Sequence, residues 1–267
     1  LSLAKRDPPT GPGTRRPTDR RGIMSSPLGR VVQFPVRQGA GLAGSTANTT
    51  RAAFRRVTEE PPGHVDDWGR DAGLFRTVTM LSEMRWAVST GGDQHLPASK
   101  GALIVVNARR FSMAHVYSAF AISRAVDRPV RFIGRPDDTT LGALAQRLGG
   151  LLDHPDEVAG ALRAGELVVH SAAVSSRPRE VGTVDHTIIG AAVASGVDLF
   201  PAATISSPFS RGARIEIGPA IRSSRRRRGP LAEYELARAV RKQIGLLLTE
   251  MGDINTGTPL DWLPLSG

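Results

Sequence analysis

The sequence predicts one α/β domain with a central, largely parallel sheet flanked by helices. Short apolar runs of strand length alternate with segments of helical periodicity between about residues 65 and 251. The segments between the apolar runs are long enough for the crossovers that parallel strands require. With 267 residues and 40% apolar content, the chain is large enough for one sizeable domain. Strands and helices that alternate in this way indicate a sheet covered on both faces.

In the first half of the domain, the sequence predicts a helix, two strands, a helix and a strand. The segment VDDWGRDAGLFRTVTMLSEM, residues 65–84, favours a helix because its apolar side chains recur at helical spacing. These side chains are Trp68, Leu74, Phe75, Val78 and Leu81. RWAVSTGGDQHLP, residues 85–97, predicts a strand that runs into a Gly-Gly turn. We then expect strands at 102–106 and 130–134, with a helix at 113–125 between them.

The second half continues the alternation. The expected elements are helices near 140–149 and 155–164, a strand at 166–171, a helix at 184–195, strands at 197–205 and 213–218, and an amphipathic helix at about 231–251. We expect the runs at 102–106, 130–134, 167–170 and 197–204 to be neighbours in one sheet, with the helices at 113–125 and 184–195 packed on it. Residues 1–63 are rich in Pro, Gly, Ser, Thr and Arg, so we assign them to a basic, disordered tail. We assign residues 64–255 to the domain and 256–267 to a C-terminal tail.

Composition excludes several classes of protein. The chain has no cysteine, so it has neither a disulfide framework nor a thiolate nucleophile or zinc ligand, and we expect no metal site. No apolar run reaches the roughly 18 to 20 residues of a membrane span. We therefore expect a cytoplasmic protein that contacts membranes only peripherally, at the inner face. Arginine occurs 32 times and lysine three times, a bias that fits a GC-rich, actinobacterial source.

The net charge of +10 comes from two segments. Residues 1–30 contribute half of it, and the run RSSRRRR at 222–228 contributes the other half. Nucleic-acid-binding domains usually spread basic residues over a folded face with aromatic residues among them, and aromatics are only 5% of this chain. A compact basic run fits an anionic membrane surface better; its alternative is an ordinary solvated loop. The predicted membrane-surface residues are Arg222, Arg225, Arg226, Arg227 and Arg228.

The order and spacing of five segments carry a resemblance to a known family. These segments are WGRD, RWAVSTGGDQHLPASKGALIVVN, ALRAGELVV, IIGAAVASGVDLFPAAT and ARIEIGPAI. Together they resemble the glycerolipid acyltransferase family, the PlsC-like lysophosphatidic acid acyltransferases, over about residues 66–251. The resemblance implies the family fold, an acyl-CoA substrate and an active site at the end of the strand at 102–106.

The catalytic dyad of that family is absent from the matching positions. In the family this strand ends in Asn-His, and an Asp follows the His; the His accepts the proton of the acceptor hydroxyl and the Asp orients the imidazole. Here Asn107 keeps the Asn, whereas Ala108 stands at the His position and Met113 at the Asp position. The resemblance therefore implies a divergent member with no catalytic residue at either position.

The phosphate-binding signature is also altered. The family has Phe-Pro-Glu-Gly-Thr-Arg-Ser in a turn after the strand that ends in LVV, and this sequence has SAAVSSR at 171–177. Ala173 replaces the Glu and Val174 replaces the Gly, so that only the hydroxyl of Ser175 remains. A β-branched residue at the Gly position also removes backbone freedom that a phosphate-binding turn uses. The Gly-x-x-x-x-Asp-Arg element of the family becomes GGLLDH, with His154 at the Arg position, while Pro201 matches a family proline.

No histidine in the sequence stands where it could replace the missing base. His115 lies on the helix after the strand, but Phe120 occupies the position where its carboxylate partner would follow. The remaining histidines are His64, His95, His154, His170 and His186. We interpret all six as structural or surface residues, because a general base must lie within reach of the proton it removes.

Three functions remain open. The first is a non-catalytic protein of the acyltransferase fold that binds an acyl lipid or a protein partner, in which Ala108, Met113 and the segment 172–174 make the former active cleft apolar or simply fill it. The second is an active acyltransferase with an atypical base, for which acyl-CoA would be a substrate and in which Arg109 and Arg110 hold a phosphate. The third is nucleic-acid binding through the arginine clusters. We predict ligand contacts at Asn107, Arg109, Arg110 and Ser175, and no cofactor.

Overall fold

The computed structural model describes seven ranges of the chain: 65–85, 87–109, 113–136, 139–175, 180–206, 212–222 and 229–252. Its helices are α2 (Ala72–Arg85), α3 (Ala114–Ala125), α4 (Thr140–Arg147), α5 (Pro155–Arg163), α6 (His186–Ser195) and α7 (Pro230–Met251), with a short 3-10 helix η1 (Asp93–His95). Its strands are β1 (Ala87–Gly91), β2 (Ala102–Arg109), β3 (Val130–Ile133), β4 (Gly150–Leu151), β5 (Leu167–Ser175), β6 (Asp198–Ser206) and β7 (Gly212–Ile217). The predicted tails lie outside these ranges.

The described strands form one seven-stranded sheet in the order β1-β7-β6-β2-β5-β3-β4. Strands β6, β2, β5, β3 and β4 are parallel neighbours, whereas β7 runs antiparallel to β6 and parallel to β1. The predicted α/β class and the four predicted neighbouring strands are confirmed. Strand β4 has only two residues, too short for a periodic pattern, and was not predicted.

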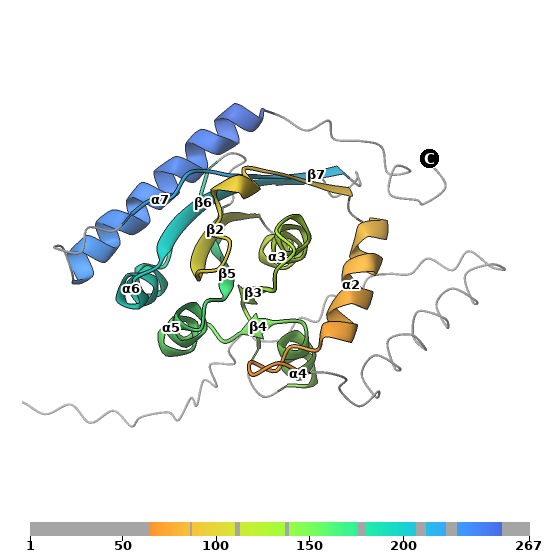
Figure 1. Cartoon of the computed structure of the whole chain (residues 1–267). Coiled ribbons are helices and arrows are strands. Elements are labelled where there is room, and N and C mark those ends of the chain that lie inside the picture. The colour runs from red at the N-terminus through yellow and green to blue at the C-terminus, as the bar shows by residue number, and fades with distance from the viewer. Residues whose placement is uncertain are drawn as a thin grey trace, which may run out of the picture. The chain divides into compact units, whose positions relative to one another are not determined.

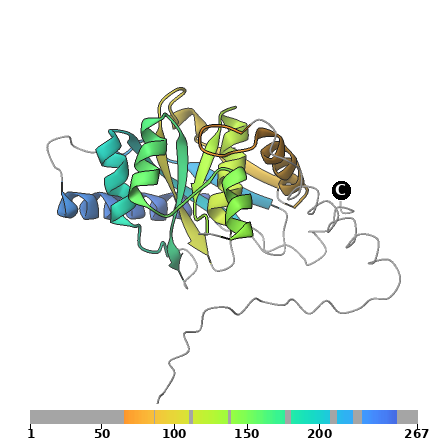
Figure 2. The same ribbon diagram turned by 90° about the horizontal axis from the view of Figure 1, so that it is seen from below.

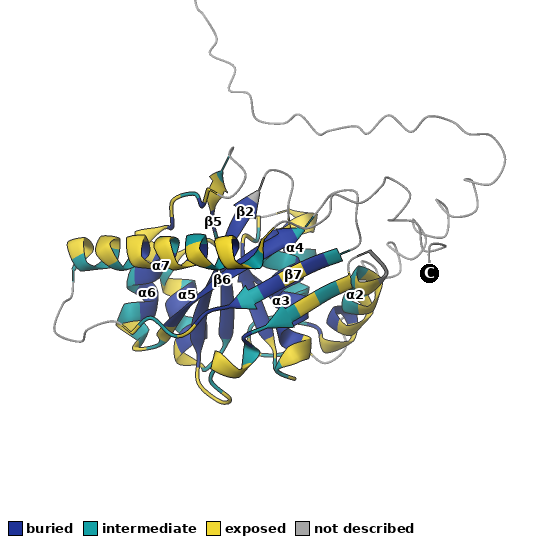
Figure 3. Ribbon diagram, turned by 90° about the horizontal axis from the view of Figure 1, so that it is seen from above, coloured by how far each residue is buried: buried dark blue, intermediate teal, exposed yellow. Residues whose placement is uncertain are grey.

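Two apolar cores cover the two faces of the sheet. On one face, α5, α6 and α7 pack over Leu103, Val168 and Leu199, among other buried residues. On the other face, α3 packs over Ile104, Val169 and further residues. The sheet curls around α3, with α5, α6 and α7 along its outer side (Figures 1 and 2). Figure 3 shows the central strands buried and the outer face of α7 exposed.

Helix α2 begins later than the sequence pattern predicts. Oδ1 of Asp71 accepts hydrogen bonds from the amides of Gly73 and Leu74, both at 3.0 Å, which caps a helix that starts at Ala72. Trp68 therefore precedes the helix and packs against the core beneath α5 and α6. Leu81, which the same pattern places in the core, is 50% exposed.

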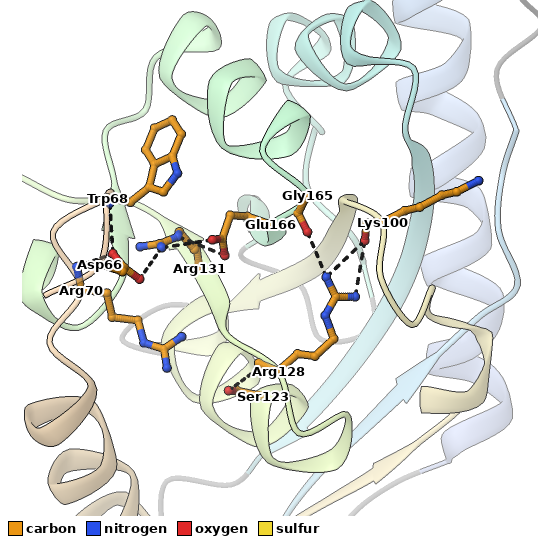
Figure 4. Close-up of polar contacts among 9 residues, drawn as sticks. All are labelled: Asp66, Trp68, Arg70, Lys100, Ser123, Arg128, Arg131, Gly165 and Glu166. Carbon is orange, nitrogen blue, oxygen red and sulfur yellow. Dashed lines mark hydrogen bonds and ion pairs between the residues drawn. The ribbon is translucent and has the colours of Figure 1, made fainter. Parts of the chain in front are cut away.

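A buried arginine fastens the segment before α2 to the sheet. Arg131, in β3, has no exposed surface, and its Nη2 donates to Oδ2 of Asp66 at 2.6 Å and to Oε1 of Glu166 at 3.3 Å (Figure 4). Its Nε lies 3.2 Å from Oε2 of Glu166, an ion-pair distance at an angle too poor for a hydrogen bond. Oδ1 of Asp66 in turn accepts the amides of Trp68 and Arg70. Burial raises the pKa of the Asp66 carboxyl, but the hydrogen bonds from Arg70 and Arg131 outweigh it and leave the pKa lowered.

A second arginine ties the neighbouring loops together at the same edge of the sheet. Arg128 donates to the carbonyl oxygen of Gly165 at 2.9 Å, and its own carbonyl accepts the hydroxyl of Ser123 (Figure 4). It also donates to the carbonyl oxygen of Pro97 at 2.6 Å. Strands β2, β3 and β5 all begin beside these groups. The amino edge of the parallel strands is therefore held by arginine contacts.

We expect Arg131→Met to lower the free energy of unfolding by about 3 kcal/mol, because it leaves the Asp66 and Glu166 carboxylates without their buried cation. The matched control is Arg124→Met, which removes the exposed ion pair with Glu83 and should cost less than about 1 kcal/mol. Urea denaturation measures both. Equal losses of unfolding free energy in the two variants would show that the ion pairs of Arg131 stabilise the fold no more than an exposed ion pair does.

Candidate functional site

The topology points to the carboxyl edge of the sheet, where β2 and β5 end side by side. After β2 the chain crosses through α3 on one face, and after β5 it crosses through α6 on the opposite face. Ligands of open α/β sheets bind beyond the carboxyl ends of the strands at such a switch point. The register of the pair shifts between Val106 and Ala108, which marks a β-bulge at the switch point.

Asn107 forms a buried link between β2 and β6. Its Nδ2 donates to the carbonyl of Thr204 at 3.0 Å, and its Oδ1 accepts the amide of Thr204 at 2.6 Å. The backbone pairing of the two strands ends at Val106 and Ala202, so this side chain continues the ladder beyond that point. The amide group thus has a structural role, and contact of Asn107 with a ligand stays a prediction.

The two positions that match the family dyad carry groups unable to transfer a proton. Ala108 is buried near the end of β2, opposite Val174 of β5. Met113 is the N-cap residue of α3, makes no side-chain cap and is 54% exposed. A methyl group and a thioether therefore stand where an imidazole and a carboxylate would be needed.

Strand β5 continues through the segment where the resemblance implies a phosphate-binding turn. Ser171 pairs with Val106, and Ser175 pairs with Arg109 at the end of the strand. The amide of Ala173 donates to the carbonyl of Thr183 at 2.8 Å, so the returning chain occupies a donor that a phosphate would require. Val174 is β-branched and SAAVS contains no glycine, so the segment is compatible with an extended strand.

The segment around Thr183, which runs back alongside β5, requires a glycine at position 182. A Cβ on Gly182 would lie only 1.9 Å from the carbonyl oxygen of Ala173, so any side chain at this position would push the returning segment off β5. The expectation of a turn at 171–177 is therefore wrong for residues 171–175, and 176 and 177 lie outside the described residues.

The predicted ligand and membrane residues are described only in part. The backbone of Arg109 ends β2, but its side chain is not described, and Arg110 lies outside the described residues together with Arg225, Arg226, Arg227 and Arg228. Ser175 is half-buried at the end of β5. Their predicted contacts stay predictions.

Arg222 is exposed and follows Ile221, which forms an isolated bridge with Leu199 at the start of β6. Because β6 runs parallel to β2, this bridge lies at the amino edge of the sheet. Arg222 thus lies at the edge opposite the carboxyl ends of β2 and β5.

The described histidines include structural ones and a pair beside the end of β3. His154 caps α5 by accepting the amide of Asp156 at 3.3 Å, and His95 Nδ1 lies 2.9 Å from the carbonyl of Ile217. His115, in the first turn of α3, packs against the Phe132 ring. His170, in β5, is 6% exposed, and among the described residues neither ring nitrogen has a hydrogen-bond partner. The interpretation of His170 as an ordinary structural histidine therefore leaves two buried polar atoms unexplained.

Burial controls the electrostatics of this pair. It lowers the pKa of both imidazoles, and so favours their neutral forms. The carboxylates of Asp153 and Asp185 act against the lowering of the His170 pKa, and the His115 imidazole adds to it. Nothing in the spacing of these four residues along the sequence indicates that they interact.

The described residues provide no group of three or more His, Asp or Glu side chains arranged to hold a metal ion. None of the helices in the described ranges combines the length and apolar character needed to cross a bilayer.

The described residues form an α/β domain whose fold is PlsC-like. The chain is similar to the solved structure of the 1-acyl-sn-glycerophosphate (LPA) acyltransferase PlsC from Thermotoga maritima, with a TM-score of 0.51 and 13% sequence identity. The similarity covers 77% of this chain and 94% of that chain. At this identity it shows the fold alone. No protein-family model and no curated protein matches the sequence.

We expect the free energy of unfolding to decrease in mild acid because His170 is buried in its neutral form. In the unfolded chain its imidazole titrates near pH 6.5, whereas burial lowers its pKa in the folded protein. Below about pH 6.5 the unfolded state therefore binds a proton that the folded state does not, and the free energy of unfolding should fall by up to about 1.4 kcal/mol per pH unit until the lowered pKa is reached. His115 acts in the same direction.

Urea denaturation at a series of pH values measures this effect. His170→Phe removes one titrating group and should reduce the slope below about pH 6.5, leaving the contribution of His115. His186→Gln, at an exposed position of α6, is the control variant. Identical slopes in the wild type and His170→Phe would contradict the assignment.

Proposed function

We propose that this chain is a non-catalytic protein of the glycerolipid acyltransferase fold that binds an acyl lipid at the carboxyl edge of β2 and β5. The observation that carries the proposal is the pair Ala108 and Met113, which leaves the edge without a base and an orienting carboxylate at the matching positions. Without a general base, acyl transfer loses a factor on the order of 100 to 10,000.

The continuation of β5 supports the same proposal. A turn that holds phosphate offers free backbone amides to the ligand. Here the amide of Ala173 is engaged by Thr183, and Ser171 and Ser175 are paired with β2. At residues 171–175, a phosphorylated acceptor would therefore find the amide of Ala173 already engaged.

The apolar character of the edge favours an acyl chain as the ligand. Val174 is 56% exposed and Met113 is 54% exposed, although most large apolar side chains of the domain are buried. Ala108, which pairs with Val174, and Ala172 are both buried. We propose that Arg109, Arg110 and Ser175 contact the polar end of the lipid, and that a protein partner is the alternative occupant.

One observation favours a second function, acyl transfer with an atypical base. His115 lies in the first turn of α3, two residues after Met113, and burial lowers its pKa so that the imidazole is neutral and able to accept a proton. In that case acyl-CoA is a substrate, and Arg109 and Arg110 hold its phosphate groups.

We expect the purified full-length chain to show no lysophosphatidate acyltransferase activity above the uncatalysed rate with acyl-CoA. The assay follows release of free coenzyme A, with wild type, Arg109→Ala/Arg110→Ala and His115→Gln compared side by side. Turnover that survives the arginine changes and disappears in His115→Gln would overturn the proposal and identify His115 as the base.

The basic run is proposed as a separate contact with membranes. Attraction of Arg222 and Arg225 to Arg228 to anionic headgroups is worth about 1 kcal/mol per arginine near the surface and is screened by salt. Because Arg222 lies at the amino edge, this contact is distinct from the lipid site. Through it we propose peripheral association with the inner face of the membrane.

We expect the full chain to bind anionic liposomes better than neutral ones at low salt, and the preference to disappear when Arg225 to Arg228 are changed to serine. Liposome flotation measures both. Changing Arg76, Arg163, Arg238 and Lys242, which are exposed and lie elsewhere in the domain, to serine is the charge-matched control and should preserve the preference. Equal flotation of the wild type and the 225–228 variant would reduce the run to a solvated loop.

A further inference from the structure

His170 is a buried polar side chain in need of a partner. It is 6% exposed, and neither Nδ1 nor Nε2 has a hydrogen-bond partner among the described residues. Buried polar groups are hydrogen-bonded as a rule, and an exception indicates an absent water, ion or ligand. Val168 and Ala172 lie on the same face of β5 and belong to the core beneath α5 and α6, so His170 points toward that side.

The position of His170 in the sheet places it where one neighbouring strand ends. Strand β5 pairs with β3 up to Val169 and Phe132, and His170 is the next residue of β5. Strand β3 ends at Ile133, and the amide of the next residue, Gly134, donates to the carbonyl oxygen of Leu151 in β4. His170 thus lies just beyond the end of β3, although it is in the interior of β5, where it pairs with Val105 of β2.

Three further titratable groups approach the same point from other elements. His115 reaches over the end of β3, since a Cβ built on Gly134 would lie 3.3 Å from its Nε2. Asp153 follows β4, and Asp185 caps α6 while its Oδ1 accepts the amide and hydroxyl of Thr187, both at 2.8 Å. All three influence His170 electrostatically.

We propose that His170 is the buried contact for an uncharged hydroxyl group of the ligand, and that the bound lipid is a glyceride with a free hydroxyl. A neutral imidazole offers one donor and one acceptor nitrogen, which matches the single donor and the acceptor lone pairs of a hydroxyl. The nearby carboxylates of Asp153 and Asp185 oppose a phosphate, because like charges in a partly buried site repel. The lipid part of this inference rests on the proposed function, whereas the hydroxyl site does not.

Two measurements on the full-length chain test the proposal. In protein labelled with 15N-histidine, glycerol is titrated as a soluble hydroxyl probe, and long-range 1H–15N spectra follow the ring nitrogens of each histidine. Isothermal titration calorimetry then compares monooleoylglycerol with oleoyl lysophosphatidate, in the wild type, in His170→Phe and in the exposed control His186→Gln.

We expect glycerol to shift the His170 nitrogens and to leave those of His186 unchanged. Monooleoylglycerol should bind the wild type on the order of tenfold more tightly than lysophosphatidate does, and His170→Phe should lose on the order of tenfold in affinity for monooleoylglycerol, the effect of one buried hydrogen bond. His186→Gln should bind like the wild type.

The outcomes separate this inference from the proposed function. Equal binding of the two lipids with no loss in His170→Phe would overturn the inference while lipid binding stands. A shift of His170 with glycerol and no binding of either lipid would support the hydroxyl site and overturn the lipid proposal. Because the spectra are recorded on the wild type, poor folding of His170→Phe would not affect them, and unchanged His170 nitrogens would sink the hydroxyl site.

Discussion

The structure of the amino edge of the sheet depends on the contacts of the buried Arg131 guanidinium with two carboxylates. It has no exposed surface, yet it is charged, so the fold must provide carboxylates for it from two directions. Asp66 comes from the turn before α2 and Glu166 from the residue before β5. Arg128 adds carbonyl contacts to two further loops. These arginines fix the starts of β2, β3 and β5, and thereby the position at which each strand ends.

The carboxyl edge differs in kind from the amino edge. Near the carboxyl edge β2 and β5 carry Ala108, Ala172 and Val174, and Asn107 is engaged with Thr204. His170, beyond the end of β3, has no hydrogen-bond partner among the described residues. A site for acyl transfer to a phosphorylated acceptor needs a base and free backbone amides at this edge. The edge instead offers exposed apolar side chains beside neutral imidazoles. This combination is the basis for proposing a lipid-binding rather than a catalytic role.

The strands of the fold could be predicted because their residues carry the signal themselves. Runs such as ALIVV at 102–106 are apolar throughout, and the helices between them have clear periodicity. The start of α2 was placed too early because the apolar Trp68 continued the helical pattern, although Asp71 is a recognisable capping residue. The apolar run ELVVHS predicts a strand only at 166–171, whereas pairing with β2 and the hydrogen bond to Thr183 extend β5 to Ser175.

The candidate site could be predicted only in part. Ala108 and Met113 come from the family resemblance, which assigns the dyad positions by counting from the apolar run at 102–106. The association of His170 with His115, Asp153 and Asp185 depends on four separate elements and on the burial that folding creates. Sequence spacing contains no signal for it.

The most direct test of a non-catalytic lipid-binding role is native mass spectrometry of the purified full-length chain, followed by extraction and identification of any bound lipid. We expect one acyl lipid with an uncharged, hydroxyl-bearing headgroup per chain, retained without conversion when acyl-CoA is added. A chain that carries no lipid, or one that converts its bound lipid to an acylated product, would contradict this account.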